Sequence, residues 1–424
     1  MRVLLVGCSA DTPHSGTGAC IARTERFRIA MQRAGLDVKA ISPREGRPGA
    51  RQVRRLCHHS GFSAAVLISP FPAEAAAMAD VDLPMWIDVN GHHPAEVQLQ
   101  GSVSGRSWER MTRILAMENL LLSTGDRFST PSRAQASAVM GELYLLGRLS
   151  AESAGLVPVE AMPHCAMPGW EHRFEKRSPD PGHIISTGSY NLWFDHETLF
   201  RALERSMDRS PEIRFTSTGG AIPFSPERYR DFCAMVERSR HSERFDLLGW
   251  VDRGRLSEVY ETAACAVYAD LPGGETMLGA RTRVLDWIGR GIPVVCTRGA
   301  EISTDLYRRG MGIAVPQDDP VALSEALLEA SLSPAAADRM VAMQREWCDG
   351  EGSIDRIFAP LIGWCRHPLR LPGRRVGKPT VRRKDSAAYL CRIFRMVLRD
   401  RGPTVAVTRA LRRLFFLRGG GSGR

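Results

Sequence analysis

Short apolar runs alternate with amphipathic stretches along the first 165 residues, and each run has the length of a buried strand. The runs predict strands at residues 2–7, 36–42, 64–69, 84–89, 126–130 and 156–160. The stretches between them predict helices at residues 20–34, 48–59, 108–123 and 132–146. The third strand is predicted to end at Pro70, Phe71 and Pro72. This alternation is typical of a mainly parallel sheet with helices on both faces.

The same plan begins again near residue 183. Strands are predicted at residues 183–187, 213–218, 244–248, 264–269, 292–297 and 312–315. Helices are predicted at residues 195–208, 226–240, 255–263, 282–290, 301–309, 319–331 and 334–347. Residues 166–181 mix Pro and Gly with charges and predict a linker. We therefore expect two tandem Rossmann-like, doubly wound α/β domains, at residues 1–165 and 182–350, with ligand-binding loops after strands of both.

The composition agrees with two folded domains. The chain has 424 residues, of which 43% are hydrophobic and 25% charged, so both domains can bury a core. No stretch of about twenty residues lacks charge, which argues against a transmembrane helix. The N-terminal sequence MRVLLVGCSADTP has too short an apolar run for a signal peptide. We therefore expect a cytoplasmic protein.

Cysteine and histidine spacing argues against a metal site. The ten cysteines show no CxxC or CxxxxH spacing, and several fall inside apolar runs. This distribution favours buried free thiols over a disulfide framework or a zinc site. The pairs His58-His59 and His92-His93 lack further ligands at metal spacing, so we expect no metal at either pair.

The positive charge is concentrated at the C-terminal end. Residues 366–424 hold 17 of the 57 Lys and Arg residues but only two of the 47 Asp and Glu residues. This segment therefore carries +15 of the net +10, and the rest of the chain carries −5. The body is mildly acidic, and the basic character belongs to a tail.

The stretch at residues 275–297, ETMLGARTRVLDWIGRGIPVVCT, predicts a loop, a helix from about Thr282 and a buried strand. Arg281 and Arg283 lie in the first helical turn, where they could grip phosphate oxygens together with the free N–H groups. Asp286 lies one turn further, and a carboxylate is the acceptor that vicinal sugar hydroxyls need. The alternative is a solvated helix end with a surface ion pair.

Other candidates follow predicted strands, where a doubly wound fold binds ligands. Glycines let the backbone approach a ligand closely, although a lone GxG also forms ordinary turns, and a histidine beside a turn is often only a surface residue. These candidates are Gly16 and Gly18 after the first strand, Asp88, Asn90 and His92 after the 84–89 strand, Gly188 after the 183–187 strand, and Glu275 in the acidic turn at residues 270–275.

The order of several motifs resembles the GT-B glycosyltransferases, closest to the family 4-type enzymes of a bacterial polysaccharide-associated branch. The motifs are LGR at residues 146–148, WFD at 193–195, GWV at 249–251, RTRVLD at 281–286 and GIPVV at 291–295. The resemblance covers roughly residues 1–365. It implies a GT-B fold and transfer of a hexosyl or deoxyhexosyl group from a nucleotide-sugar donor. It also implies retention of the anomeric configuration, with no metal and no other cofactor.

The resemblance also implies roles for individual residues. Asp286, seven residues before Pro293, would bind the donor ribose, and Glu275 would lie by the donor sugar. Many relatives hold the diphosphate with a basic pair after the first strands of the second domain, but this chain has no Lys or Arg between Gly188 and Asp195. Arg281 and Arg283 are the expected substitutes. The assignment is then catalytic His92, Glu275 and Arg283, donor-binding Gly16, Gly18, Gly188, Arg281, Thr282 and Asp286, and acceptor-side Asp88 and Asn90.

The C-terminal region predicts two further features. Residues 351–367 suit a helix that returns to the first domain. Residues 368–424 start as a basic linker rich in Gly and Pro, and then place apolar faces opposite arginines at residues 387–398 and 404–417. This pattern predicts a basic amphipathic helical tail on an anionic membrane surface, with nucleic acid as the alternative partner.

The expected protein is therefore a cytoplasmic glycosyltransferase, attached peripherally to the inner face of the cell membrane. It would move a sugar from a nucleotide-sugar donor to a lipid-linked glycan or polysaccharide acceptor. Two alternatives stay open at this point. One is a non-catalytic GT-B protein that binds nucleotide sugar or glycan as an assembly partner, and the other is a nucleotide-sugar epimerase.

Overall fold

The structure is a computed structural model of the chain, and it describes residues 1–9, 18–104, 107–222 and 226–372. The described residues all belong to one compact unit. The predicted tail helices and Gly16 lie outside the described residues. Among those residues, no helix is both long enough and apolar enough to cross a membrane.

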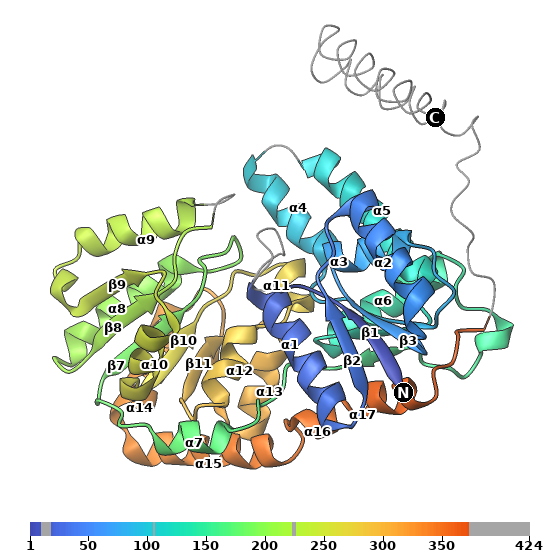
Figure 1. The fold of residues 1–424 in the computed structure, drawn as a ribbon. Helices are drawn as coiled ribbons and strands as arrows, with labels where there is room; N and C mark the ends of the chain where they lie inside the picture. Colours follow the sequence, from blue (N-terminus) through green and yellow to red (C-terminus); the bar gives the residue numbers. More distant parts are fainter. Residues whose placement is uncertain (10–17, 105–106, 223–225, 373–424) are drawn as a thin grey trace, which may run out of the picture. The chain divides into compact units, whose positions relative to one another are not determined.

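The first sheet has six parallel strands in the order β2-β1-β3-β4-β5-β6 (Figure 1). Every residue of its inner strand β3, with the sequence AAVLI, is buried, as expected for a parallel strand covered on both faces. The strands are β1 Arg2–Val6, β2 Asp37–Ile41, β3 Ala64–Ile68, β4 Met85–Asp88, β5 Arg127–Thr130 and β6 Val159–Ala161.

Helices cover both faces of this sheet. Ala50 and Val53 of α2 pack with Leu4 and Val6 of β1 in one core cluster, and α1 packs in a second cluster on Val3 and Leu5. Alternate residues of β1 therefore face opposite layers. The helices are α1 Gly18–Arg33, α2 Gly46–Ser60, α3 Phe71–Met78, α4 His93–Ser104, α5 Ser107–Thr124 and α6 Arg133–Leu145.

The second sheet also has six parallel strands, in the order β12-β11-β10-β7-β8-β9. Its strands are β7 His183–Thr187, β8 Arg214–Thr218, β9 Phe245–Gly249, β10 Cys265–Tyr268, β11 Val294–Thr297 and β12 Gly312–Val315. Its helices are α8 His196–Arg209, α9 Glu227–Glu237, α10 Arg253–Thr262, α11 Gly274–Leu278, α12 Thr282–Ile288, α13 Glu301–Arg309, α14 Pro320–Leu332 and α15 Pro334–Asp349. One core cluster serves this whole sheet.

The last two described helices, α16 Ile354–Ile357 and α17 Ala359–Arg366, pack on the first sheet. The Phe358 ring lies 4.8 Å from that of Phe27 on α1, edge to face. The Trp364 ring lies 5.6 Å from that of Trp86 on β4. The chain therefore crosses back after the second sheet and completes the first core.

Every strand that the hydrophobic pattern predicted is present in one of the two six-stranded sheets. The predicted fold class, tandem doubly wound α/β, is confirmed. Several helices were not predicted. One is α3, which begins at Phe71, inside the predicted break, because proline is tolerated in a first helical turn. Another, α7 Trp170–Glu175, lies inside the predicted linker, where Trp170 and Phe174 are buried one turn apart. The chain at residues 351–365 forms two short helices instead of one.

The prediction of free thiols is wrong for one pair of cysteines. Cys8, after β1, and Cys20, in α1, form a disulfide. The cysteine spacing did not predict this disulfide, because neither residue belongs to a recognisable spacing motif. The other described cysteines are free and are buried or half-buried, as expected.

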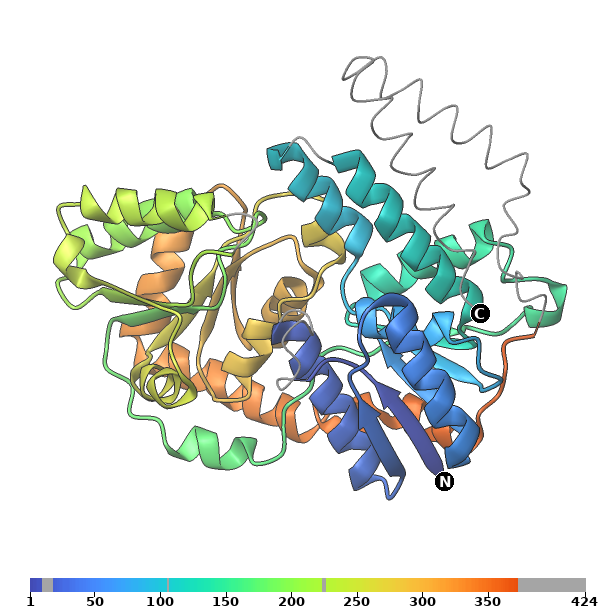
Figure 2. The same cartoon turned by 45° about the horizontal axis from the view of Figure 1, so that its top comes forward.

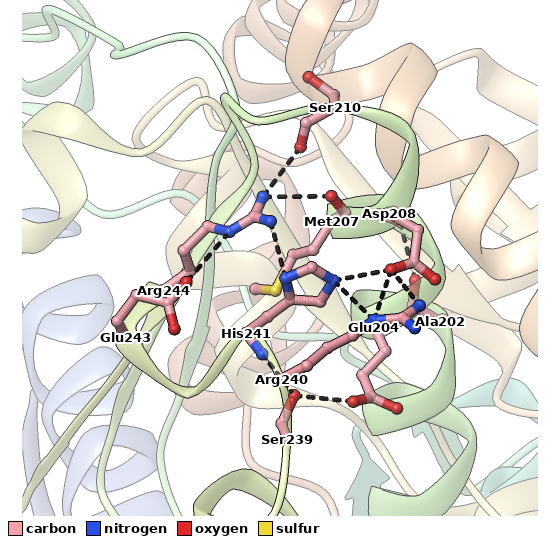
Figure 3. Close-up of polar contacts among 11 residues, drawn as sticks. Ala202, Glu204, Met207, Asp208, Ser210, Ser239, Arg240, His241, Glu243 and Arg244 are labelled. Carbon is pink, nitrogen blue, oxygen red and sulfur yellow. Dashed lines mark hydrogen bonds and ion pairs between the residues drawn. The ribbon is translucent and has the colours of Figure 1, made fainter.

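A polar cluster closes the end of α8 against the turn that leads into β9 (Figure 3). Asp208 accepts hydrogen bonds from Arg240 Nε at 3.0 Å and from the His241 ring at 2.7 Å. The other ring nitrogen of His241 lies 2.7 Å from Arg244 Nη2, and Arg244 Nη1 donates to the Ser210 carbonyl. These bonds fix the connection between α9 and β9.

Candidate active site

Two loops of the second domain lie side by side because they follow neighbouring strands, β7 and β10. The backbone N–H of Asp195 donates to the Ala269 carbonyl at 2.9 Å, and that of Leu271 donates to the Trp193 carbonyl at 2.8 Å. The carboxyl ends of parallel strands meet at one edge of a sheet, where doubly wound folds bind ligands. The α11–α12 segment joins this edge.

Arg281 holds the acidic loop together. Its Nε donates to Asp270 at 2.6 Å, and its Nη1 and Nη2 donate to the two oxygens of Glu275 at 3.0 and 2.9 Å. Nη2 also lies 3.3 Å from Thr276 Oγ1, and the guanidinium stands 5.5 Å from the Trp193 ring centroid. All three charged groups are buried. The donors of Arg281 are thus engaged within the protein and do not point to open solvent.

Burial dominates the electrostatics of this triad. It raises the pKa of Asp270 and the pKa of Glu275, while Arg281 opposes both shifts. Burial likewise opposes the charge of Arg281, but the two carboxylates outweigh it and raise the Arg281 pKa. With all three groups ionised, the triad has a net charge of about −1 in a low-dielectric setting, which favours a further cation nearby.

Arg283 is that nearby cation. Its Nη2 donates to the Ser189 carbonyl at 2.8 Å, and its guanidinium lies 5.9 Å from the Phe194 ring centroid. Gly188 has φ +94°, and a Cβ built there would lie 3.5 Å from the guanidinium. Burial lowers the Arg283 pKa, whereas Asp270 supports its charge. Within the described part of the chain, no carboxylate forms an ion pair with Arg283, so its charge is left for a ligand.

Asp286 and Thr282 contact the first domain. Arg26 of α1 donates from Nη2 to Asp286 Oδ1 at 3.1 Å, and Figures 1 and 2 both place α1 next to α12. Thr282 Oγ1 lies 3.0 Å from His164 Nε2. Burial, with help from Arg26, lowers the His164 pKa well below its usual value, so this histidine is neutral. The Asp286 carboxylate is half exposed and therefore still accessible to another partner.

Asp88 is an internal group of the first domain. Arg23 Nε and Nη2 donate to its two oxygens at 3.0 and 2.8 Å, and Ser129 Oγ donates at 2.6 Å. The side chains of Asp88 and Arg23 are completely buried. Asp88 therefore supports the end of β4 from inside. Asn90, two residues later, is half-buried, and its backbone N–H donates to Ser69 Oγ.

His92 lies at the start of α4 and is held at both ring nitrogens. Nδ1 accepts from the Ala95 backbone N–H at 3.2 Å, so Nε2 carries the proton and faces Glu142 of α6, also at 3.2 Å. Helix α11, which carries Glu275, contacts both α4 and α6. The loop that holds His92 therefore approaches the acidic loop of the second domain.

The structure gathers Gly188, Glu275, Arg281 and Arg283 at one edge of the second sheet. Thr282 and Asp286 lie on the adjoining α12, while Asp88 and Asn90 belong to the first domain. Gly18 is the exposed first residue of α1. In the described ranges, no group of His, Cys, Asp and Glu is arranged to hold a metal ion.

Sequence reasoning did not single out three residues of this region. Asp270 was noted only as part of an acidic turn, although its position directly after the β10 strand was a usable signal. No signal in the sequence pointed to Arg26 or His164, because their partners lie 260 and 118 residues away in the chain.

One sequence family matches the second domain. Residues 181–331 match the sequence family described as Glycosyl transferases group 1, which is less than half of the chain. No curated protein sequence matches the chain.

Solved structures of the same fold cover nearly the whole described chain. Sucrose-phosphate synthase from Thermosynechococcus elongatus has a TM-score of 0.61 and 15% identity, over 86% of this chain and 98% of that one. HepE from Anabaena, in complex with UDP and glucose, has a TM-score of 0.60 and 12% identity, over 86% and 99%. A structure described as trehalose-6-phosphate from E. coli, bound with UDP-2-fluoro glucose, has a TM-score of 0.59 and 13% identity, over 87% and 100%.

At these identities the likeness concerns the fold alone. The described chain therefore has the two-domain GT-B fold that it shares with these proteins, and its second domain matches the group 1 glycosyl transferases in sequence.

Proposed function

We propose that this protein is a glycosyltransferase that transfers a hexosyl or deoxyhexosyl group from a nucleoside-diphosphate sugar. The observation that carries the proposal is the Arg283 guanidinium, which faces Gly188 without a carboxylate partner among the described residues. It lies in the segment that matches the group 1 glycosyl transferases. Two similar structures hold UDP or a UDP-sugar analogue, so uridine nucleotides are the first donors to test.

In the proposed mechanism, negative charge grows on the leaving diphosphate as the bond to the anomeric carbon breaks. Arg283 and the N–H groups at the start of α12 would stabilise that charge, and a preorganised donor of this kind costs no reorganisation during the reaction. The backbone at Gly18 and Gly188 would approach the donor. Asp286 would accept hydrogen bonds from the ribose hydroxyls.

In this proposal Arg281 does not have the phosphate-binding role that the sequence predicted. Because Asp270 and Glu275 occupy its donors, it would position Glu275 and would not grip phosphate itself. Glu275 would then face the donor sugar with its carboxylate held in place. The proposed transfer is metal-independent, since Arg283 and the N–H groups at the start of α12 would supply the positive charge that the leaving diphosphate needs. Retention of the anomeric configuration is proposed on the resemblance to family 4-type enzymes alone.

The acceptor would be a lipid-linked glycan or a polysaccharide, presented from the side of the first domain near Asn90 and His92. Asp88 would contribute by fixing the end of β4. The basic residues at 368–424 would attach the protein to the inner face of the cell membrane, where a lipid-linked acceptor is found.

A non-catalytic nucleotide-sugar or glycan binder is the second candidate. It is favoured by one observation: Arg281 is engaged by carboxylates, and the loop from Gly188 to Asp195 has no Lys or Arg, so Arg283 is left as the main cation at this edge. A single guanidinium would hold a diphosphate less firmly than a basic pair.

Incubation of the purified chain with a panel of nucleotide sugars tests the proposal. A transferase releases nucleoside diphosphate only when an acceptor is present, apart from slow hydrolysis of the donor. A binder raises the melting temperature with the donor but releases nothing, and an epimerase converts the donor sugar without an acceptor. Absence of both turnover and a shift in melting temperature with every donor would contradict the proposal.

A further inference from the structure

Helix α2 of the first domain presents an unbroken basic stripe. Arg47, Arg51, Arg55 and His59 recur every four residues, which places them on one face of the helix, and all four are exposed. Residues 46–60 contain no Asp or Glu. Among the described residues, none of these four side chains takes part in an ion pair. Like charges four residues apart on a helix repel one another, and an anionic partner would offset that repulsion.

The stripe borders a groove of about 520 Å³ between α2 and β2. β2 is the edge strand of the first sheet, so the groove is open on its outer side. Ile41 and Leu56 provide apolar surface, and Lys39, Gln52, Arg55 and His59 complete the lining. Figure 2 shows α2, in blue, extended along this side of the first domain.

The side chains that line the groove favour one class of anionic partner over others. It combines a cationic rim with an apolar floor, which fits a phosphate headgroup together with the start of an acyl chain. None of the lining residues is a Trp, Tyr or Phe on which a nucleobase or sugar ring would stack. The groove also has no carboxylate to accept hydrogen bonds from sugar hydroxyls.

We propose that α2 and the α2–β2 groove form a docking surface for a bilayer that contains anionic phospholipid. The surface belongs to the folded first domain and is distinct from the C-terminal tail and from the candidate active site. The proposal does not depend on glycosyl transfer, because binding to vesicles is measured without turnover.

Sedimentation of the full chain with lipid vesicles tests the proposal. The variant Arg47→Gln/Arg51→Gln/Arg55→Gln removes the three arginines of the stripe, and the matched control is Arg201→Gln/Arg205→Gln/Arg209→Gln. The control removes three exposed arginines with the same spacing from α8 of the second domain, so both variants lose the same net charge. Vesicles are made of phosphatidylcholine with or without phosphatidylglycerol, and melting temperatures confirm that both variants fold.

We expect the α2 variant to bind phosphatidylglycerol vesicles more weakly by about fivefold per lost arginine, and the control to lose far less. Amide hydrogen exchange in residues 46–60 should slow when anionic vesicles are added to the unmodified chain. Equal losses in the two variants, or no loss in either, would overturn the proposal, because the tail alone would then account for binding. Loss of affinity for single-stranded RNA, with vesicle binding intact, would reassign the surface to nucleic acid.

Discussion

The substitution Arg283→Gln tests the candidate site most directly. In the ligand-free structure Arg283 donates to a backbone carbonyl at 2.8 Å and has no ion pair in the described ranges, so its removal leaves no buried carboxylate without a partner. Burial already disfavours its charge. Asp270 supports that charge, so the two effects offset each other and we expect a nearly unchanged melting temperature. This separates a binding role from a structural one.

The expected loss in donor recognition follows from the bonds that Arg283 would make. A hydrogen bond between a charged group and a ligand contributes about 1.5–3 kcal/mol, so kcat/KM should fall roughly ten- to hundredfold. If Arg283 acts mainly on the leaving phosphate, kcat should carry more of the loss than KM. Arg283→Lys should recover only part of it, because an ammonium lacks the planar pair of donors.

The assay is release of nucleoside diphosphate over a range of donor concentrations, together with calorimetric titration of the nucleotide alone. Arg255→Gln is the matched control, since Arg255 is an exposed arginine of the same domain that pairs with Glu258 on α10. Unchanged kcat/KM and unchanged nucleotide affinity in folded Arg283→Gln would refute the placement of the diphosphate.

Three further predictions concern charged groups elsewhere. Arg281→Met should reduce the free energy of unfolding by about 3–5 kcal/mol in a denaturant titration, because it leaves Asp270 and Glu275 buried without a cation; a loss below about 1 kcal/mol would show that these carboxylates are solvated. Arg26→Gln should strengthen nucleotide binding by up to about fivefold in calorimetry, because the ribose no longer competes for the carboxylate on α12; weaker binding would mean that Arg26 itself contacts the nucleotide. Asp208→Asn should lower stability by at most about 1 kcal/mol at neutral pH, since hydrogen bonds from its arginine and histidine neighbours lower the Asp208 pKa, while solvent screens this exposed ion pair. The difference should shrink as pH falls below about 4, where the carboxylate becomes protonated in the unfolded and then in the folded chain, and an equal difference at acid pH would contradict the ion-pair explanation.

The hydrophobic pattern predicted the two sheets because buried parallel strands leave a strong local signal. Runs such as AAVLI in β3 are apolar throughout, and they need no knowledge of their neighbours to be recognised. The missed helices lacked such a signal. α11 has only five residues, and α7 lies in a stretch where Pro and Gly suggested a linker. Its two buried aromatic residues pack against the second domain, which no local window shows.

The candidate site, too, could be predicted from the sequence only in part. Glu275, Arg281 and Arg283 lie within nine positions of one another, so their clustering could be predicted, but the ion pairs could not. Whether an arginine faces a ligand or a carboxylate depends on the path of the loop after β10. That loop brings Asp270 to Arg281 and leaves Arg283 beside Gly188. Two arginines with the same apparent role therefore have opposite surroundings.

Two contacts join α12 to the first domain. Asp286 was predicted to bind a ribose, and in the ligand-free structure its partner is Arg26. A nucleotide that binds the Asp286 oxygen held by Arg26 would compete with a cation of the first domain, and part of its binding energy would go into separating that pair. At the same helix, Thr282 is bonded to a neutral His164. Donor binding and the contact between the domains would then be linked through α12, because both compete for the same face of one helix.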